Sequence, residues 1–187
     1  MKITFNAPIT LVFSLICAVV YFLFTSNMPP RIFVLGGHFD WANWKWYLSL
    51  IGYTMGHGSV SHLIGNLSLV LLLGPILEEK YGSKKLLIMI VLSAVITAFV
   101  HILFFSHNLI GASGIAFMMI TLVSLTNVKG NNIPITFILI FVLYVGGEIY
   151  RSFGDDNVSQ FAHIAGGVLG AIFGFNVKPN KNSAMII

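Results

Sequence analysis

The chain has 187 residues, of which 57% are apolar and only 9% charged, and its formal net charge is +4. Soluble domains carry about 25% charged residues and need a polar surface, so this composition excludes a water-soluble globule and a disordered chain. The single cysteine excludes a disulfide-stabilised scaffold, and the ten basic residues form no dense patch of the kind that binds nucleic acid. A membrane protein built from apolar helices is the class that remains.

Six apolar stretches predict an all-α bundle of six transmembrane helices. Each stretch is close to the length of about 20 residues that crosses the hydrocarbon layer. The predicted spans are residues 7–24, 60–77, 86–105, 109–125, 133–149 and 160–176. They form one membrane domain over residues 1–187, and the first stretch, which no A-x-A-like cleavage site follows, is predicted to be retained rather than cleaved as a signal peptide. The connection over residues 26–59 is unusually long for a compact bundle and is therefore a candidate functional element.

The distribution of basic residues predicts the orientation of the spans. Seven lie on one side of the predicted bilayer, at Lys2, Lys80, Lys84, Lys85, Lys129, Lys178 and Lys181. Three lie on the other side, at Arg31, Lys45 and Arg151. By the positive-inside rule both termini face the cytoplasm, and the long first connection lies outside. Its aromatic residues fit either an interfacial segment on the outer leaflet or anchors for the helix ends. They are Trp41, Trp44, Trp46 and Tyr47.

Four polar side chains enter the predicted bilayer at a similar depth. His62 and Asn66 lie in the first two turns of the second span. Ser113 lies about one turn into the fourth span, and His163 about one turn into the sixth. These three spans run in the same direction, so all four side chains are predicted within roughly 5–10 Å of the outer interface. Because polar groups are costly in hydrocarbon, a nucleophile and potential bases at one level indicate a functional site.

Small residues are predicted to bring the fourth and sixth spans together. They are Gly111 and Gly114 on either side of Ser113, and Gly166 and Gly170 on the helical face of His163. Such faces allow close approach of two helix backbones. The Ser113 hydroxyl would then lie near the His163 imidazole, which can accept its proton and return it to a leaving group.

The other polar residues of the spans limit the catalytic arrangement. No aspartate lies in a predicted span, which favours a Ser-His dyad over a Ser-His-Asp triad. Glu148 and Arg151 are three residues apart at the edge of the fifth span and are predicted to pair with one another. His62 and Asn66 share one face of the second span and are predicted either to stabilise an oxyanion, together with the Ser113 N–H, or to form an interhelical hydrogen-bonded pair.

Four short motifs stand in a defined order along the chain. They are His57-Gly58-Ser59-Val60-Ser61-His62-Leu63-Ile64-Gly65-Asn66, then Glu78 followed by Gly82, then Gly111-Ala112-Ser113-Gly114, then Ala162-His163-Ile164-Ala165-Gly166 with Gly170. In this order and spacing they resemble the rhomboid family of intramembrane serine proteases. The resemblance covers essentially the whole chain, as the minimal six-span core of that family. It implies hydrolysis of peptide bonds in or near the transmembrane segments of other membrane proteins.

The resemblance also implies roles for the four polar residues at the common depth. Ser113 matches the nucleophile and His163 the general base. His62 and Asn66 match the side-chain donors to the oxyanion. Together with the sequence argument, these matches predict a serine endopeptidase that works through a Ser-His dyad.

The supporting residues match the family with two departures. Glu78 matches a structural glutamate at the cytoplasmic end of the second span, and Gly166 and Gly170 match its close-packing glycines. Phe117 stands where the family has a tyrosine that packs on the catalytic imidazole, so the ring is kept and the hydroxyl lost. The first connection also lacks the Trp-Arg pair that many members carry. His57 is either a residue that orients this loop or an incidental one.

Two other functions compete with a protease. A rhomboid-like pseudoprotease would bind transmembrane clients without cleaving them, but such proteins usually lack the serine or the histidine that this chain keeps. A small transporter would show polar groups along a midplane pathway and an inverted repeat, and neither is visible. No cofactor or metal is expected, since the H-E-x-x-H signature is absent. The predicted partners are transmembrane substrates and the lipid bilayer, without nucleic acid, and the predicted location is a bacterial inner membrane.

Overall fold

The computed structural model describes residues 5–24, 29–126, 132–151 and 160–180, and in these ranges the chain is built from helices, with only an isolated bridge between Leu35 and Leu109. The main helices are α1 (Pro8–Leu23), α2 (Trp44–Gly52), α3 (Val60–Tyr81), α4 (Ser83–Phe104), α5 (Ser113–Ser124), α6 (Ile135–Ile140), α7 (Gly147–Arg151) and α8 (Gln160–Asn176). Short 3-10 turns occupy Arg31–Phe33 and Tyr53–Met55. A π-helical segment, η3 (Phe141–Gly146), joins α6 to α7 without a break.

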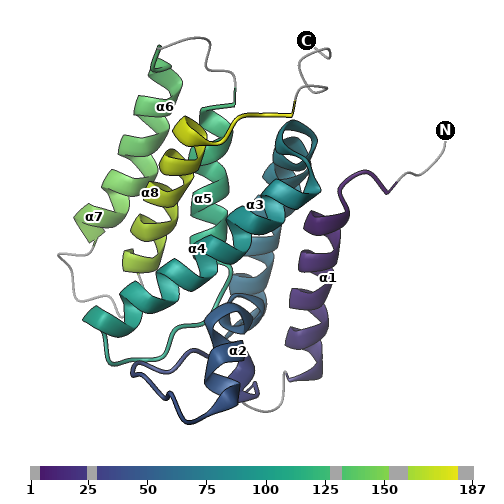
Figure 1. The fold of residues 1–187 in the computed structure, drawn as a ribbon, viewed down its shortest axis with the longest axis vertical. Helices are drawn as coiled ribbons and strands as arrows, with labels where there is room; N and C mark the ends of the chain where they lie inside the picture. Colours follow the sequence, from purple (N-terminus) through teal and green to yellow (C-terminus); the bar gives the residue numbers. More distant parts are fainter. Residues whose placement is uncertain (1–4, 25–28, 127–131, 152–159, 181–187) are drawn as a thin grey trace.

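The helices form a bundle in which α5 and α8 lie side by side near the centre (Figure 1). The segment from α6 to α7 flanks α8 on one side, whereas α3 and α1 lie on the other side of α5. The starts of α3, α5 and α8 lie at one end of the bundle, together with α2. The start of α1 and the end of α8 lie at the opposite end. The polar residues near the starts of α3, α5 and α8 are therefore gathered at one end of the molecule.

Glycines allow the close approach of α5 and α8. A Cβ at Gly166 would overlap the carbonyl oxygen of Gly114, and one at Gly170 would overlap the carbonyl oxygen of Met118. Only a residue without a side chain leaves room for this backbone contact. The contact sets the distance between the helix that carries Ser113 and the helix that carries His163.

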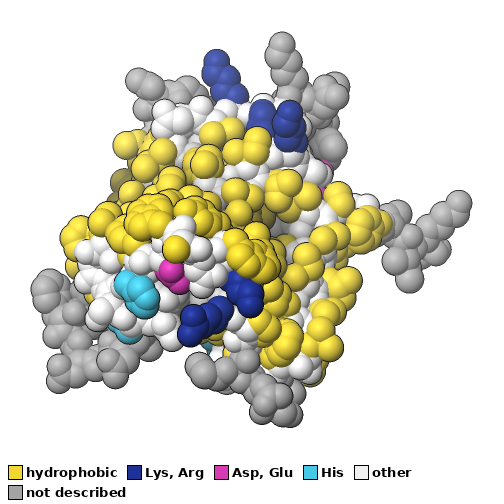
Figure 2. Space-filling view, turned by 60° about the horizontal axis from the view of Figure 1, so that its bottom comes forward, with side chains coloured by type: hydrophobic (Ala, Val, Ile, Leu, Met, Phe, Trp, Pro, Cys, Tyr) yellow, Lys and Arg dark blue, Asp and Glu magenta, His cyan; other side chains and the backbone are white. Residues whose placement is uncertain are grey.

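Apolar side chains cover much of the outer surface of the bundle. Large hydrophobic residues are exposed on α1, α3, α4, α6 and α8. Figure 2 shows a broad hydrophobic band across one face, with lysine and arginine side chains gathered above and below it. By length and composition α3 and α4 are each able to cross a membrane, whereas α1, α5 and the helix over residues 135–150 are apolar but shorter. An exposed apolar surface of this extent is expected where lipid replaces water.

The fourth apolar stretch differs from its prediction at its start. The sequence predicts a helix from residue 109, but α5 begins at Ser113. Leu109 instead forms two backbone hydrogen bonds with Leu35, of 2.9 and 3.0 Å, and Gly111 has a φ of 120° that a right-handed helix does not allow. Ser113 is therefore the first residue of its helix and does not lie one turn into it.

Glu78 fastens the end of α3 to the start of α1. Its carboxylate accepts hydrogen bonds from the N–H of Ile9 at 2.9 Å, the N–H of Thr10 at 3.0 Å and the hydroxyl of Thr10 at 2.9 Å. First-turn N–H groups have no partner within their own helix, and a negative charge there also complements the helix dipole. The buried glutamate thus caps α1 from another helix and fixes where α1 packs.

We predict that Glu78→Ala destabilises the fold by about 3 kcal/mol, because the first turn of α1 loses its acceptors in a buried position. The check is thermal unfolding of the purified variants in one detergent. Glu79→Ala is the matched control, since Glu79 is the neighbouring acidic residue and is exposed. Equal unfolding midpoints for the two variants would contradict the capping role of Glu78.

Candidate active site

A hollow of about 530 Å³ lies where the starts of α3, α5 and α8 meet. The segment over residues 107–110 forms part of its wall. The hollow is lined by the residues that the sequence singles out, which are Ser113, His163, His62, Asn66 and Phe117. Residues separated by about 100 positions in the chain therefore share one cavity. The structure brings together every candidate catalytic and oxyanion residue.

The backbone just before Ser113 lies close to the side chains of His62 and Asn66 on α3. The N–H of Gly111 donates to the carbonyl oxygen of Tyr53 at 2.9 Å, which anchors this turn. A Cβ at Gly111 would lie only 2.7 Å from His62 Nε2 and 3.6 Å from Asn66 Nδ2. Glycine is required here by its positive φ and by this close approach. The side chains of His62 and Asn66 therefore lie beside the N-terminus of α5. The N–H of Ser113, in the first turn of α5, is a further hydrogen-bond donor at this place.

The start of α3 is fixed by its own cap and by a buried histidine. Ser59 Oγ accepts from the N–H of His62 at 3.1 Å, as an N-cap residue does. Asn66 Nδ2 lies 3.1 Å from His57 Nε2, and His57 Nδ1 lies 3.3 Å from the carbonyl oxygen of Met55. Burial, with a smaller contribution from the neighbouring His62, lowers the pKa of His57 to about 4.

A neutral His57 explains these two contacts. Its Nδ1–H donates to Met55, and its Nε2 accepts from the amide N–H of Asn66. The second donor on Asn66 Nδ2 is then available to the hollow that this residue lines. His57 thus connects Met55, in the segment before α3, to Asn66 on α3, and the side chain that it orients is that of Asn66.

The imidazole of His163 stacks on the ring of Phe117. The ring centroids are 4.4 Å apart and the planes differ by 6°. Phe117 also meets Tyr144 of η3 edge to face, with centroids 6.0 Å apart. The aromatic ring at position 117 therefore packs on the histidine without a hydroxyl, and it fixes the plane of the imidazole.

One acidic residue reaches this site that the sequence does not predict to be there. Glu148 Oε2 lies 3.1 Å from His163 Nδ1, and the two side chains are 5% and 15% exposed. The sequence predicts a pair between Glu148 and Arg151, and the Arg151 side chain lies outside what the structure describes. The sequence does contain a sign that Glu148 has a function, because a carboxylate inside an apolar stretch is costly in hydrocarbon unless it has a partner.

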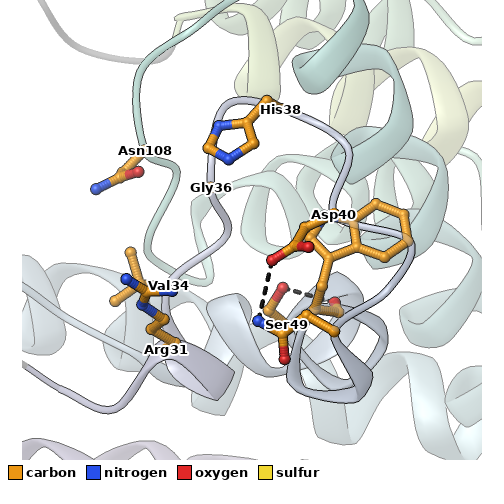
Figure 3. Close-up of a pocket in the computed structure, with 9 residues that line it drawn as sticks. Arg31, Val34, Gly36, His38, Asp40, Ser49 and Asn108 are labelled. Carbon is orange, nitrogen blue, oxygen red and sulfur yellow. Dashed lines mark hydrogen bonds between the residues drawn. The ribbon is translucent and has the colours of Figure 1, made fainter.

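The long first connection forms a second, separate hollow of about 270 Å³ (Figure 3). Arg31, His38 and Asp40 lie on its wall, and Asn108 borders both hollows. Asn43 stabilises this loop by donating to Asp40 Oδ2 at 3.0 Å. It also accepts from the N–H of Lys45 at 3.1 Å as the N-cap of α2.

The aromatic residues of the connection divide into two groups. Trp46 is buried and packs against Phe39 and Phe99, which holds α2 onto α4. Trp41 and Trp44 are 59% and 66% exposed. Trp46 therefore packs α2 onto the bundle, and the interfacial position of the exposed rings stays a prediction.

The family model of the Rhomboid domain matches residues 43–180, which include every residue that lines the candidate site. The chain belongs to the rhomboid family. It is 27% identical over 189 residues to the "Rhomboid protease GlpG" of Haemophilus influenzae, and the match covers 95% of each chain. It is 25% identical over 191 residues to the protein of the same name from Yersinia pestis, covering 96% of this chain and 66% of that protein. The resemblance inferred from the motifs is thus confirmed, and the relatives are proteases by name.

Proposed function

We propose that this rhomboid is an intramembrane serine endopeptidase in which Ser113 is the nucleophile and His163 is the general base. The observation that carries the proposal is the single hollow that Ser113, His163, His62 and Asn66 line together. Membership of the family and its protease relatives support the same reaction class. A nucleophile, a base and a set of donors around one space are the parts that acyl transfer needs.

The reaction follows from the position of each group. Ser113 Oγ attacks the scissile carbonyl carbon while His163 accepts the hydroxyl proton. The oxyanion that forms is held by the N–H of Ser113 with the side chains of His62 and Asn66. His163 then gives the proton to the leaving amine, and the acyl group remains on Ser113. A water molecule, deprotonated by His163, releases the acid and restores the serine.

The oxyanion donors are worth most in this setting. Removing a single such donor typically costs about 2.7–4 kcal/mol of transition-state stabilisation. The cost is high because a hydrogen bond to the oxyanion is stronger in a site with little water than in bulk water. His57 contributes indirectly by fixing the amide of Asn66.

The placement in the membrane is part of the proposal. Six spans, with both termini in the cytoplasm, would put the open hollow near the outer surface of a bacterial inner membrane. The exposed apolar helices and the charges beyond them support a bilayer position. Substrates would be the transmembrane segments of other proteins, locally unwound where they reach Ser113.

The alternative without catalysis, a pseudoprotease that binds transmembrane clients, has less support. A protein that only binds has no need for a serine at a helix N-terminus, donors beside it and a histidine held by ring stacking. The chain keeps all of these groups in one hollow.

Cleavage of a model transmembrane substrate in proteoliposomes tests the proposal. The purified protein is reconstituted with a fluorescent single-span substrate, and the products are identified by mass spectrometry. We expect one principal cut near the outer end of the substrate span. Binding of the substrate without any cleavage, by protein that is folded, would favour the pseudoprotease.

A further inference from the structure

Glu148 is a buried acidic residue that the dyad mechanism leaves without a role. It belongs to α7, a different helix from those of Ser113 and His163, and its side chain is only 5% exposed. Burying a carboxylate is unfavourable unless a charged or polar partner compensates for the lost hydration. Its Oε2 lies 3.1 Å from His163 Nδ1, which is within ion-pair distance. The placement of such a costly group against the base calls for an explanation.

We infer that Glu148 is a positioning residue for His163, which holds the imidazole of the Ser113–His163 pair in the tautomer that catalysis needs; this rests on the proposed function. A carboxylate oxygen 3.1 Å from Nδ1 favours a proton on that ring atom, because its negative charge attracts an N–H and repels a ring lone pair. The lone pair of Nε2 then points away from α7 and is available to the Ser113 hydroxyl.

The proton balance is the same as in other serine hydrolases. The Ser113 proton moves to Nε2 and the imidazole becomes a cation, with Nδ1–H retained. Glu148 stays ionised throughout and stabilises this cation, and no proton passes to the carboxylate. The serine loses its proton only as its oxygen forms the bond to the carbonyl carbon.

Among the described side chains near the imidazole of His163, Glu148 is the one placed to select its tautomer. Phe117 stacks on the ring and fixes its plane, but a phenyl ring cannot select a tautomer. A small hollow of about 300 Å³ shares Phe117 with the hollow of Ser113 and is lined by Phe117, Leu143, Tyr144 and Glu148. In the described part of the chain, the titratable side chains that line these two hollows besides His163 and Glu148 are His62, His107 and Tyr144. The acidic side chain is Glu148, and Nδ1 is the ring atom that it approaches.

The direct test is the tautomer of His163 in the protein labelled with ¹⁵N-histidine in detergent micelles, with the His163 signals assigned by comparison with His163→Ala. We expect a protonated Nδ1 and an unprotonated Nε2 in the wild type. Glu148→Gln, which removes the charge at nearly constant volume, should give a mixture of tautomers and lower kcat by about 10²-fold or more, with KM nearly unchanged. Glu79→Gln is the control for loss of an acidic residue elsewhere on the chain.

Each outcome decides the inference separately from the proposed function. A neutral His163 that carries its proton on Nε2 in the wild type would overturn the inference. This measurement is made on the wild-type protein and does not depend on the folding of a Glu148 variant. A Glu148→Gln protein with wild-type kcat and tautomer would also overturn it, as would a fall in kcat with an unchanged tautomer, which marks a structural role. If Glu148→Gln does not fold, Glu148→Asp keeps the charge and should retain the Nδ1–H tautomer. The proposed function is tested separately, by Ser113→Ala. If that variant loses cleavage, the proposed function stands even where the results for Glu148 overturn the inference.

Discussion

Replacing Ser113 with alanine should lower kcat for cleavage of a transmembrane substrate by at least about 10³-fold, because the proposed acyl intermediate forms on the Ser113 hydroxyl, which shares the hollow with His163. Substrate binding should change little, since the substitution removes one oxygen atom. The measurement is the rate of product formation by purified protein in proteoliposomes. Both variant and wild type are first shown to have the same thermal unfolding midpoint.

Ser68→Ala is the matched control for this substitution. Ser68 also belongs to one of the helices that border the hollow, but its side chain is exposed and donates to the carbonyl oxygen of Ile64. We expect wild-type rates for this variant. Undiminished cleavage by Ser113→Ala would remove the serine from the mechanism.

Gly166→Val should have the largest effect on stability. A Cβ at this position overlaps the backbone of Gly114, and a backbone atom cannot move aside as a flexible side chain can. The branched side chain would separate α5 from α8 or distort both, at a cost of about 3 kcal/mol or more. The separation also moves His163 away from Ser113, so the activity that remains at low temperature should fall as well. The measurement is thermal unfolding in detergent.

Gly65→Ala is the control for Gly166→Val and for the milder Gly166→Ala. A Cβ at Gly65 meets no atom within 4 Å, and alanine favours a helix over glycine by about 1 kcal/mol. We therefore expect an unfolding midpoint equal to or above that of the wild type. A Gly166→Ala variant as stable as Gly65→Ala would contradict the backbone contact between α5 and α8.

The sequence is informative about helices and about the depth of polar groups. Runs of apolar residues predict helices because each run is long, and α8 occupies residues 160–176 as the pattern indicates. The meeting of Ser113 and His163 in one hollow was also foreseeable, since glycines spaced on one helical face predict a close neighbour. These inferences need only local periodicity and the high cost of polar groups in an apolar setting.

Contacts between distant segments account for what the sequence does not predict. The start of α5 is set by a bridge to Leu35, far away in the chain, so periodicity alone extends the helix to residue 109. The contact of Glu148 with His163 joins two helices, and a local rule for charges three residues apart contains no information about it. The bond of His57 to Asn66 likewise depends on how the loop before α3 folds back.

Reaction with a fluorophosphonate is the most direct measurement of the central claim, that Ser113 is a nucleophile activated by His163. The reagent forms a stable adduct only with an activated serine, and peptide mapping by mass spectrometry locates it. We expect a single adduct, on Ser113, that is lost in Ser113→Ala and falls at least about 10²-fold in rate in His163→Ala. An adduct on another serine, or no adduct on protein that cleaves its substrate, would contradict the claim.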